Sequence, residues 1–111
     1  MTTKTQAELE MIAKDPWDAC MYAIHELQGR FELGEEAIAT HSKCSLLYAI
    51  HALKGPFPLG EKAISKYGVD SLDYAERALK GPFPLGEEAI AMDDELLYEY
   101  SQVLIQHLKK P

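Results

Sequence analysis

Apolar and polar residues recur along this chain with a period of 26 residues. Residues 48–65 read YAIHALKGPFPLGEKAIS and residues 74–91 read YAERALKGPFPLGEEAIA, and a looser copy at residues 22–39 reads YAIHELQGRFELGEEAIA. A tyrosine marks the same position in each copy and in a further, partial one: Tyr22, Tyr48, Tyr74 and Tyr100. A fixed period of this size is typical of repeat arrays, in which each unit completes its core by stacking on its neighbours.

Within each repeat, the spacing of apolar residues predicts a first helix that contains the tyrosine. An Ala follows the Tyr directly in the three copies and a Leu stands five residues after it, so the two are four residues apart and share one helical face. A Gly comes soon after this Leu. Because a left-handed residue commonly ends a helix, we expect this role for Gly29, Gly55 and Gly81.

A stiff connector and a second helix complete the repeat. Prolines on both sides of a phenylalanine fix the backbone of the second and third connectors in an extended conformation. We expect the three connector phenylalanines to be buried beneath the next helix: Phe31, Phe57 and Phe83. The second helix, around residues 34–38, 60–64 and 86–90, has glutamates in its first turn that complement the helix dipole. It is too short to be stable without packing.

The two ends of the chain depart from the full repeat. Thr5-Gln6-Ala7-Glu8 matches a capping box that opens a half-repeat, and residues 94–109 form one longer helix without a connector. Acidic residues mark helix starts at residues 15–18, 70–73 and 93–95. The sequence therefore predicts a single all-α domain over residues 1–111, a short α-solenoid of antiparallel helix pairs. It has about three full repeats, a half-repeat at the N-terminus and a longer capping helix at the C-terminus.

Composition narrows the functional classes. Eleven basic and eighteen acidic side chains give a net charge of −7, which repels phosphates, so we expect no direct binding of nucleic acid. The first 15 residues lack the apolar core of a signal peptide, and no apolar run reaches membrane-spanning length, so we expect a cytoplasmic protein without membrane contact. Cys20 and Cys44 occupy different repeat positions, which favours free, mostly buried thiols.

The string YAxxxLKGxFPxGExAI resembles a tandem helical repeat of uncharacterised proteins from bacteriophages and large viruses, which typically runs YAxxVLKGRFPEGE. The resemblance covers roughly residues 8–104. Arg30 keeps the family's Arg, whereas Pro56 and Pro82 replace it. Three leucines stand where the family has Glu: Leu33, Leu59 and Leu85. Because the motif is structural, the resemblance implies no catalytic residues. It also implies a viral or mobile-element origin and a host-cell location.

One polar column lies close to the tyrosines on the first helix. His25, His51 and Arg77 each follow a tyrosine by three residues, so we expect the two columns to share a helical face. The polar column is either a solvent-facing row or part of a partner-binding surface, and the tyrosines are either structural or a ligand-facing aromatic row. Neighbouring helices pack about 8–10 Å apart, which is too far for two imidazoles to share a metal ion. We therefore expect no metal and no cofactor.

A second candidate surface is acidic. Glutamates gather at successive starts of the second helix: Glu35, Glu36, Glu61, Glu87 and Glu88. They form either a solvated face or a surface that meets a basic partner. Because no nucleotide-binding, metalloprotease or serine-hydrolase motif is present, and because a short solenoid offers a groove rather than a deep pocket, we do not expect an enzyme.

These features give two functional hypotheses. The first is a protein–protein interaction module, an adaptor or inhibitor whose tyrosine, histidine and arginine columns dock another protein. The alternative is an acidic mimic of nucleic acid that blocks a DNA- or RNA-binding protein. Since the ends of a solenoid expose apolar surface unless capped, a homodimer is a further candidate assembly.

Overall fold

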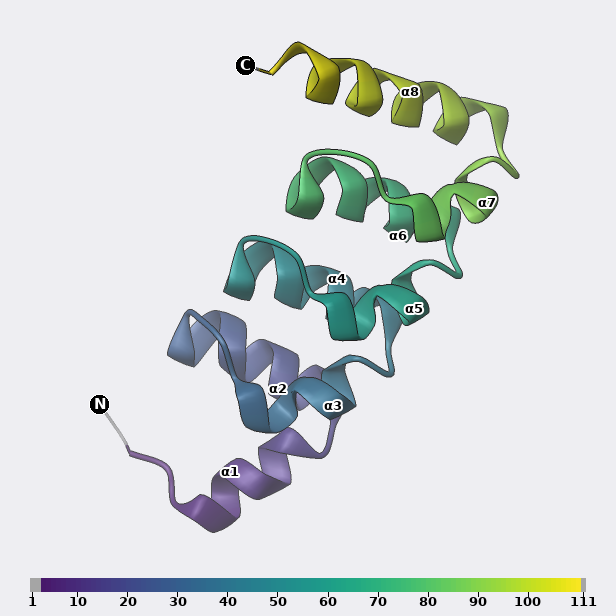
Figure 1. Ribbon diagram of the computed structural model, residues 1–111. Coiled ribbons are helices and arrows are strands. Elements are labelled where there is room, and N and C mark those ends of the chain that lie inside the picture. Colours follow the sequence, from purple (N-terminus) through teal and green to yellow (C-terminus); the bar gives the residue numbers. More distant parts are fainter. Residues whose placement is uncertain (1–2, 111) are drawn as a thin grey trace.

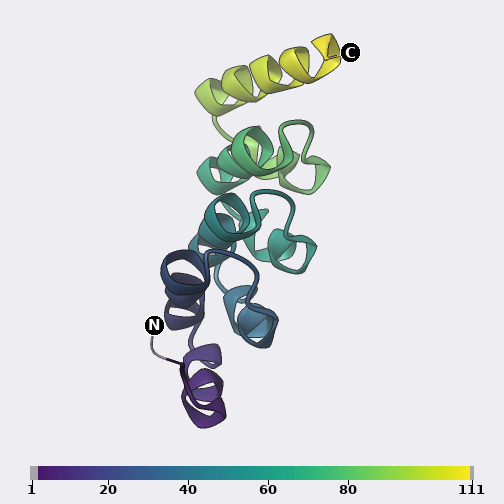
Figure 2. The same cartoon turned by 90° about the vertical axis from the view of Figure 1, so that its left-hand side faces the viewer.

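The structure is a computed structural model that describes residues 3–110, and it is an elongated stack of helices. The stack measures 47 × 30 × 17 Å. In Figure 1 the chain climbs from the N-terminus to the C-terminus, one repeat above another. In Figure 2 the first helices form one column and the second helices lie beside it. All regular structure in residues 3–110 is helical, which confirms the predicted short helical-repeat fold.

Each first helix begins as an α-helix and ends as a π-helix. The pairs are α2 (Pro16–Met21) with η1 (Tyr22–Leu27), α4 (Ser42–Leu47) with η3 (Tyr48–Leu53), and α6 (Gly68–Asp73) with η5 (Tyr74–Leu79). Each second helix is one 3-10 turn followed by one α-helical turn. These are η2 (Glu32–Gly34) with α3 (Glu35–Ile38), η4 (Pro58–Gly60) with α5 (Glu61–Ile64), and η6 (Pro84–Gly86) with α7 (Glu87–Ile90). Helix α1 (Gln6–Ala13) precedes this series and α8 (Asp94–Lys109) follows it.

Side-chain caps fix several helix starts. The capping box of Thr5 and Glu8 is present, as predicted, and Asp15 and Asp93 are the expected N-caps of α2 and α8. Sequence reasoning missed one cap. His41 precedes α4, and its Nδ1 accepts a hydrogen bond of 3.3 Å from the backbone N–H of Cys44. This bond leaves the free N–H of a neutral imidazole on Nε2.

The predicted start of the third first helix at residues 70–73 is wrong. Helix α6 begins at Gly68, and Asp70 lies inside its first turn. The carboxylate of Asp70 accepts hydrogen bonds of 2.7 Å each from Ser42 Oγ and Lys43 Nζ, which belong to the preceding repeat. The side chain therefore ties two repeats together instead of capping its own helix.

The predicted glycine caps are also wrong by one residue. Left-handed backbone occurs at the residue before each Gly, with φ of 53°, 56° and 55° at Gln28, Lys54 and Lys80, whereas Gly29, Gly55 and Gly81 have no positive φ. The N–H of Gly29 bonds the carbonyl of Ala23 six residues back at 3.2 Å, as in a Schellman ending. Nothing in the structure explains why residue 55 is a glycine.

A different set of glycines is required by close packing. A Cβ atom placed on Gly60 would come within 2.5 Å of Ser45 Oγ, and one on Gly86 equally close to Ser71 Oγ. Any side chain at these glycines would push the second helix away from the first helix of its own repeat. The small residues at both positions therefore set the distance between the paired helices.

The connector phenylalanines are buried, as predicted. Phe31, Phe57 and Phe83 are 6, 2 and 2% exposed. Each ring packs edge-on against the tyrosine of its own repeat, with centroids 4.8–5.0 Å apart. Such a pair stabilises the fold by about 0.5–1.5 kcal/mol beyond the contribution of the apolar area that it buries.

Phe57→Ala should lower the free energy of unfolding by about 3–5 kcal/mol, because it removes a fully buried ring from the middle of the stack. Leu59→Ala in the same connector is the matched control, since Leu59 is 57% exposed. Urea denaturation of both variants checks the difference. A midpoint for Phe57→Ala as high as that of the control would show that the ring is not a core residue.

Candidate functional site

The tyrosine hydroxyls connect each repeat to the one before it. The backbone N–H of Phe31 donates to the Tyr48 hydroxyl at 2.8 Å, and that hydroxyl donates to Glu35 Oε2 at 2.5 Å. Since Tyr48 belongs to the second repeat and both partners belong to the first, one hydroxyl satisfies a buried donor and a partly buried carboxylate across the junction.

The same bridge recurs at every later junction. Tyr74 accepts from the N–H of Phe57 at 2.8 Å and donates to Glu61 at 2.6 Å. Tyr100, which α8 contributes, makes the equivalent bonds of 2.9 and 2.6 Å to the N–H of Phe83 and to Glu87. The repeated Tyr and Glu columns are therefore hydrogen-bond partners of one another.

This bridge corrects the predicted aromatic half of the partner-binding face. Tyr48 and Tyr74 are 0% exposed, so neither presents aromatic surface to a partner, and they do not share a free face with the polar column. Tyr22 is half-buried; Lys4 Nζ lies 5.8 Å from its ring centroid. The tyrosine column is structural, one of the two interpretations the sequence left open.

The polar column is exposed. His25, His51 and Arg77 all point into solvent from η1, η3 and η5. They form the solvent-facing row that the sequence offered as one interpretation, and their use by a partner stays a prediction. Within residues 3–110 no group of three or more His, Cys, Asp or Glu side chains is placed to hold a metal ion.

The acidic surface is smaller than the sequence suggests. Glu35, Glu61 and Glu87 accept the tyrosine hydroxyls, and Glu35 also pairs with Arg30 at 2.6 Å. Glu36 and Glu88 are exposed and stay free for solvent, but the intervening repeat has Lys62 at that position. The glutamates therefore divide into a structural column and an interrupted surface column.

Burial makes the tyrosine and cysteine side chains resist ionisation. Desolvation raises the pKa of the Tyr48 and Tyr74 phenols, and it raises that of Tyr100 to about 12. It also raises the pKa of Cys20 to about 11 and that of Cys44 to about 12. Both thiols are free and buried, as predicted, and thiolate chemistry at neutral pH is disfavoured.

A column that the sequence analysis did not select is apolar and exposed. Leu33, Leu59 and Leu85 sit in the 3-10 turns η2, η4 and η6 and are 50, 57 and 58% exposed. Of the other apolar columns shared by all three repeats, those at the tyrosine, alanine and phenylalanine positions and at Ile38, Ile64 and Ile90 are buried or half-buried. In the column of Leu27, Leu53 and Leu79, Leu27 is 44% exposed and the other two are half-buried. The sequence signal for the leucine column was a leucine at the same position of every copy.

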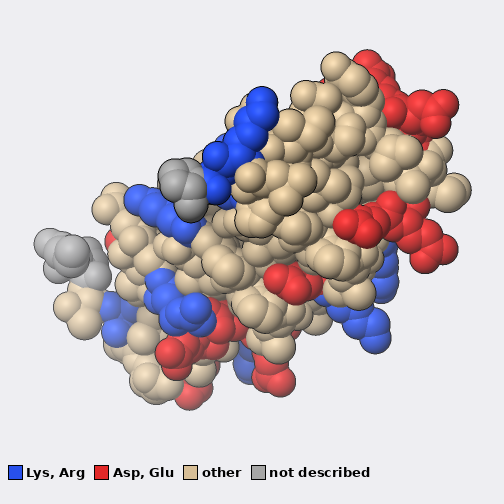
Figure 3. Space-filling view, turned by 45° about the horizontal axis from the view of Figure 1, so that its top comes forward, with Lys and Arg blue, Asp and Glu red and all other residues tan. Residues whose placement is uncertain are grey.

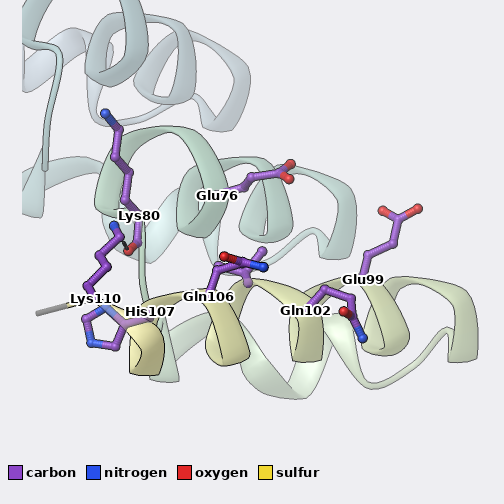
Figure 4. Close-up of a pocket in the computed structure, with 8 residues that line it drawn as sticks. Glu76, Lys80, Glu99, Gln102, Gln106, His107 and Lys110 are labelled. Carbon is purple, nitrogen blue, oxygen red and sulfur yellow. Dashed lines mark hydrogen bonds between the residues drawn. The ribbon is translucent and has the colours of Figure 1, made fainter.

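The hollows of the surface are open and shallow. One of about 260 Å³ lies between η5 and α8 (Figure 4). Glu76 and Glu99 extend toward one end of it, and His107 and Lys110 lie at the other, where Lys110 Nζ donates to the carbonyl of Lys80 at 3.3 Å. The charged groups line an open groove and do not converge on a common point.

No protein-family model matches the chain, and neither the curated proteins nor the solved structures searched include a similar one. Family membership and function therefore stay predictions. Within residues 3–110, the helices are all too short or too polar to span a bilayer.

Tyr74→Phe should lower the free energy of unfolding by about 1–3 kcal/mol, because the buried N–H of Phe57 and the carboxylate of Glu61 would both lose their partner. Tyr22→Phe is the matched control, since the Tyr22 hydroxyl makes no hydrogen bond to the described residues, and it should change stability by less than about 0.5 kcal/mol. Chemical denaturation measures both. Equal effects of the two substitutions would contradict a structural role for the bridging hydroxyl.

Stability should fall as pH rises above about 9–10. In this range the unfolded chain loses protons from Cys and Tyr side chains that the folded protein retains, so the unfolded state binds fewer protons and becomes favoured. Tyr100→Phe should flatten the decline because it removes one such group, whereas Tyr98→Phe, at an exposed position, should not. Denaturation midpoints measured from neutral to strongly alkaline pH test this, and a pH-independent midpoint would contradict it.

Proposed function

We propose that this protein is a non-enzymatic interaction module, an adaptor or inhibitor that docks another protein along the row formed by Leu33, Leu59 and Leu85. The observation that carries the proposal is their exposure of 50–58% at one repeated position. The first repeat has diverged at the neighbouring residues Arg30 and Glu32, yet it keeps the leucine. A single exposed leucine needs no explanation, but a leucine exposed at the same position of every repeat forms a regular apolar row that offers a partner several contacts.

The arrangement of the turns makes the row regular. Turns η2, η4 and η6 occupy equivalent places in stacked repeats, so the three leucines follow one edge of the array (Figures 1 and 2). Exposed prolines precede two of them, Pro58 and Pro84, and restrict the backbone around the row. A preorganised surface loses less conformational entropy on binding than a mobile one.

Charge near the row favours a partner with apolar and basic groups. Glu36 and Glu88 are exposed three residues beyond the first and third leucines, and the net charge of the chain is −7. Charges at the rim of an interface mainly raise the association rate. The nucleic-acid mimic has weaker support, because three of the five repeated carboxylates accept tyrosine hydroxyls.

Three variants of the protein distinguish the candidate surfaces. The first replaces Leu33, Leu59 and Leu85 with Ser. The second replaces His25, His51 and Arg77 with Ala, and the third replaces Glu36 and Glu88 with Gln. All eight positions are exposed, so each variant should fold like the wild type, which thermal unfolding checks.

Capture of a partner from the organism that encodes the protein, followed by affinity measurement with the isolated partner, tests the proposal. We expect the leucine variant to bind at least about 10-fold more weakly, since each truncation removes part of the apolar contact, and the His/Arg variant to bind like the wild type. Loss of binding in the His/Arg variant alone would place the interface on the first helices. Loss in the Glu variant together with steep salt dependence would favour the charge mimic.

A further inference from the structure

The two ends of the described array are complementary halves of a repeat. Helix α8 is a first helix, since Tyr100 follows Tyr74 by one period, and no second helix follows it in residues 3–110. Helix α1 is a second helix, since residues 10–13 precede residues 36–39 by one period, and no first helix precedes it there. Within residues 3–110, each end of the array therefore shows the half of a repeat that the other end does not.

The outer side of α8 is apolar. Leu97 corresponds to Ser71, which contacts Gly86 of the second helix, and Tyr98 corresponds to the buried Leu72. In α8 these positions are uncovered, and its exposed large apolar side chains are Leu97, Tyr98, Ile105 and Leu108, at 44, 66, 42 and 81%. Figure 3 shows this end as a largely uncharged surface between acidic residues on one side and Lys or Arg on the other. Terminal helices of solenoids usually have a polar outer face, so this one is unusual.

The opposite end has a hollow at the place where the repeat register would put a preceding first helix. It measures about 360 Å³ and lies between α1 and the first helix of the first repeat. Its lining combines Ile12, Met21 and Tyr22 with His25 and with the charged residues Lys4, Asp18 and Glu26. Met11, which precedes the lining residue Ile12 on α1, is 72% exposed. Helix–helix contact of the kind found at the internal junctions would cover these side chains.

We propose that the protein self-associates head to tail, with α8 of one copy seated in the hollow between α1 and η1 of the next copy. This contact follows the register of the internal repeat-to-repeat interface across two chains, without its closest helix packing, and does not involve the leucine row.

The repeat register gives the alignment of the two copies. Ala63 lines a hollow with residues 40–43, which lie at the start of the first helix of its own repeat. Met11 stands two periods before Ala63, and residues 92–95 stand two periods after residues 40–43. In the proposed contact, Met11 would therefore lie beside residues 92–95 of the neighbouring copy. Met92 is 85% exposed and would be covered by this contact. Lys109 near the end of α8 and Glu26 near the end of η1 would lie at the same end of parallel helices, with opposite charges.

The contact between chains is looser than an internal junction. Leu97 and Glu8 occupy the positions that Ser45 and Gly60 occupy in the close contact of the second repeat. Two larger side chains keep α1 farther from α8, so we expect association at high micromolar concentration rather than a permanent dimer. Because a head-to-tail contact does not close on itself, dimers should grow into longer oligomers as concentration rises.

Two end-blocked variants test the proposal by sedimentation. Met11→Lys with His25→Lys places charge at the hollow, and Tyr98→Lys with Leu108→Lys places charge on α8; all four positions are exposed. Each variant alone should be monomeric, because only one functional end is left. An equimolar mixture should form a 1:1 heterodimer and nothing larger, since the free α8 of the first variant can occupy the free hollow of the second.

His51→Lys adds the same charge in the middle of the array and should associate like the wild type. Three results would overturn the proposal: a wild type that stays monomeric at all concentrations, a Met11/His25 variant that still dimerises through α8 alone, or association that both end-blocked variants retain. The second result would indicate a symmetric α8–α8 dimer, and the third would place the contact away from the ends.

Discussion

The array depends on one hydroxyl group at each junction. The phenylalanine of each connector has a backbone N–H that its own repeat does not satisfy, and the hydroxyl of the following tyrosine accepts it at 2.8–2.9 Å. The same hydroxyl donates to a glutamate at the start of the second helix. Because a buried unpaired N–H is costly, every repeat needs the next one for its own backbone to be satisfied. Stacking is therefore enforced by hydrogen bonding as well as by apolar burial.

This constraint decides which repeated residues are free to act on other molecules. A residue that recurs at every period is either used by the stack or available to a partner, and periodicity alone does not distinguish the two. Tyr48 and Glu35 recur because they bond each other across a junction. Leu59 recurs without being buried, and its exposed side faces away from the contacts that hold the repeats together. For finding a binding surface, the exposure of a repeated side chain is thus more informative than its repetition.

Much of the fold was predictable because it follows from local chemistry. The period, the buried phenylalanines, the capping box of Thr5 and the long last helix were all confirmed. The errors arose where a contact with another repeat overrides a local signal. Asp70 is a residue type that favours an N-cap, but its carboxylate binds Lys43 of the neighbouring repeat. The tyrosines fit a helical face by spacing, yet their hydroxyl partners are 13 and 17 residues away, beyond any local pattern.

The candidate surfaces could be predicted only in part, for the same reason. In a periodic sequence, a repeated residue that is buried and one that is exposed cannot be told apart. Only the burial of each side chain shows that the repeated tyrosines are unavailable to a partner and that the repeated leucines are exposed. The uncovered surface of α8 follows more directly from the repeat register than the surface rows do. Every internal first helix is covered by its own second helix and by the next repeat, so the side chains at residues 97 and 98 stand where two contacts are expected, and the structure supplies neither within one chain. The packing of one first helix on the following repeat therefore also defines the surface through which the array can extend.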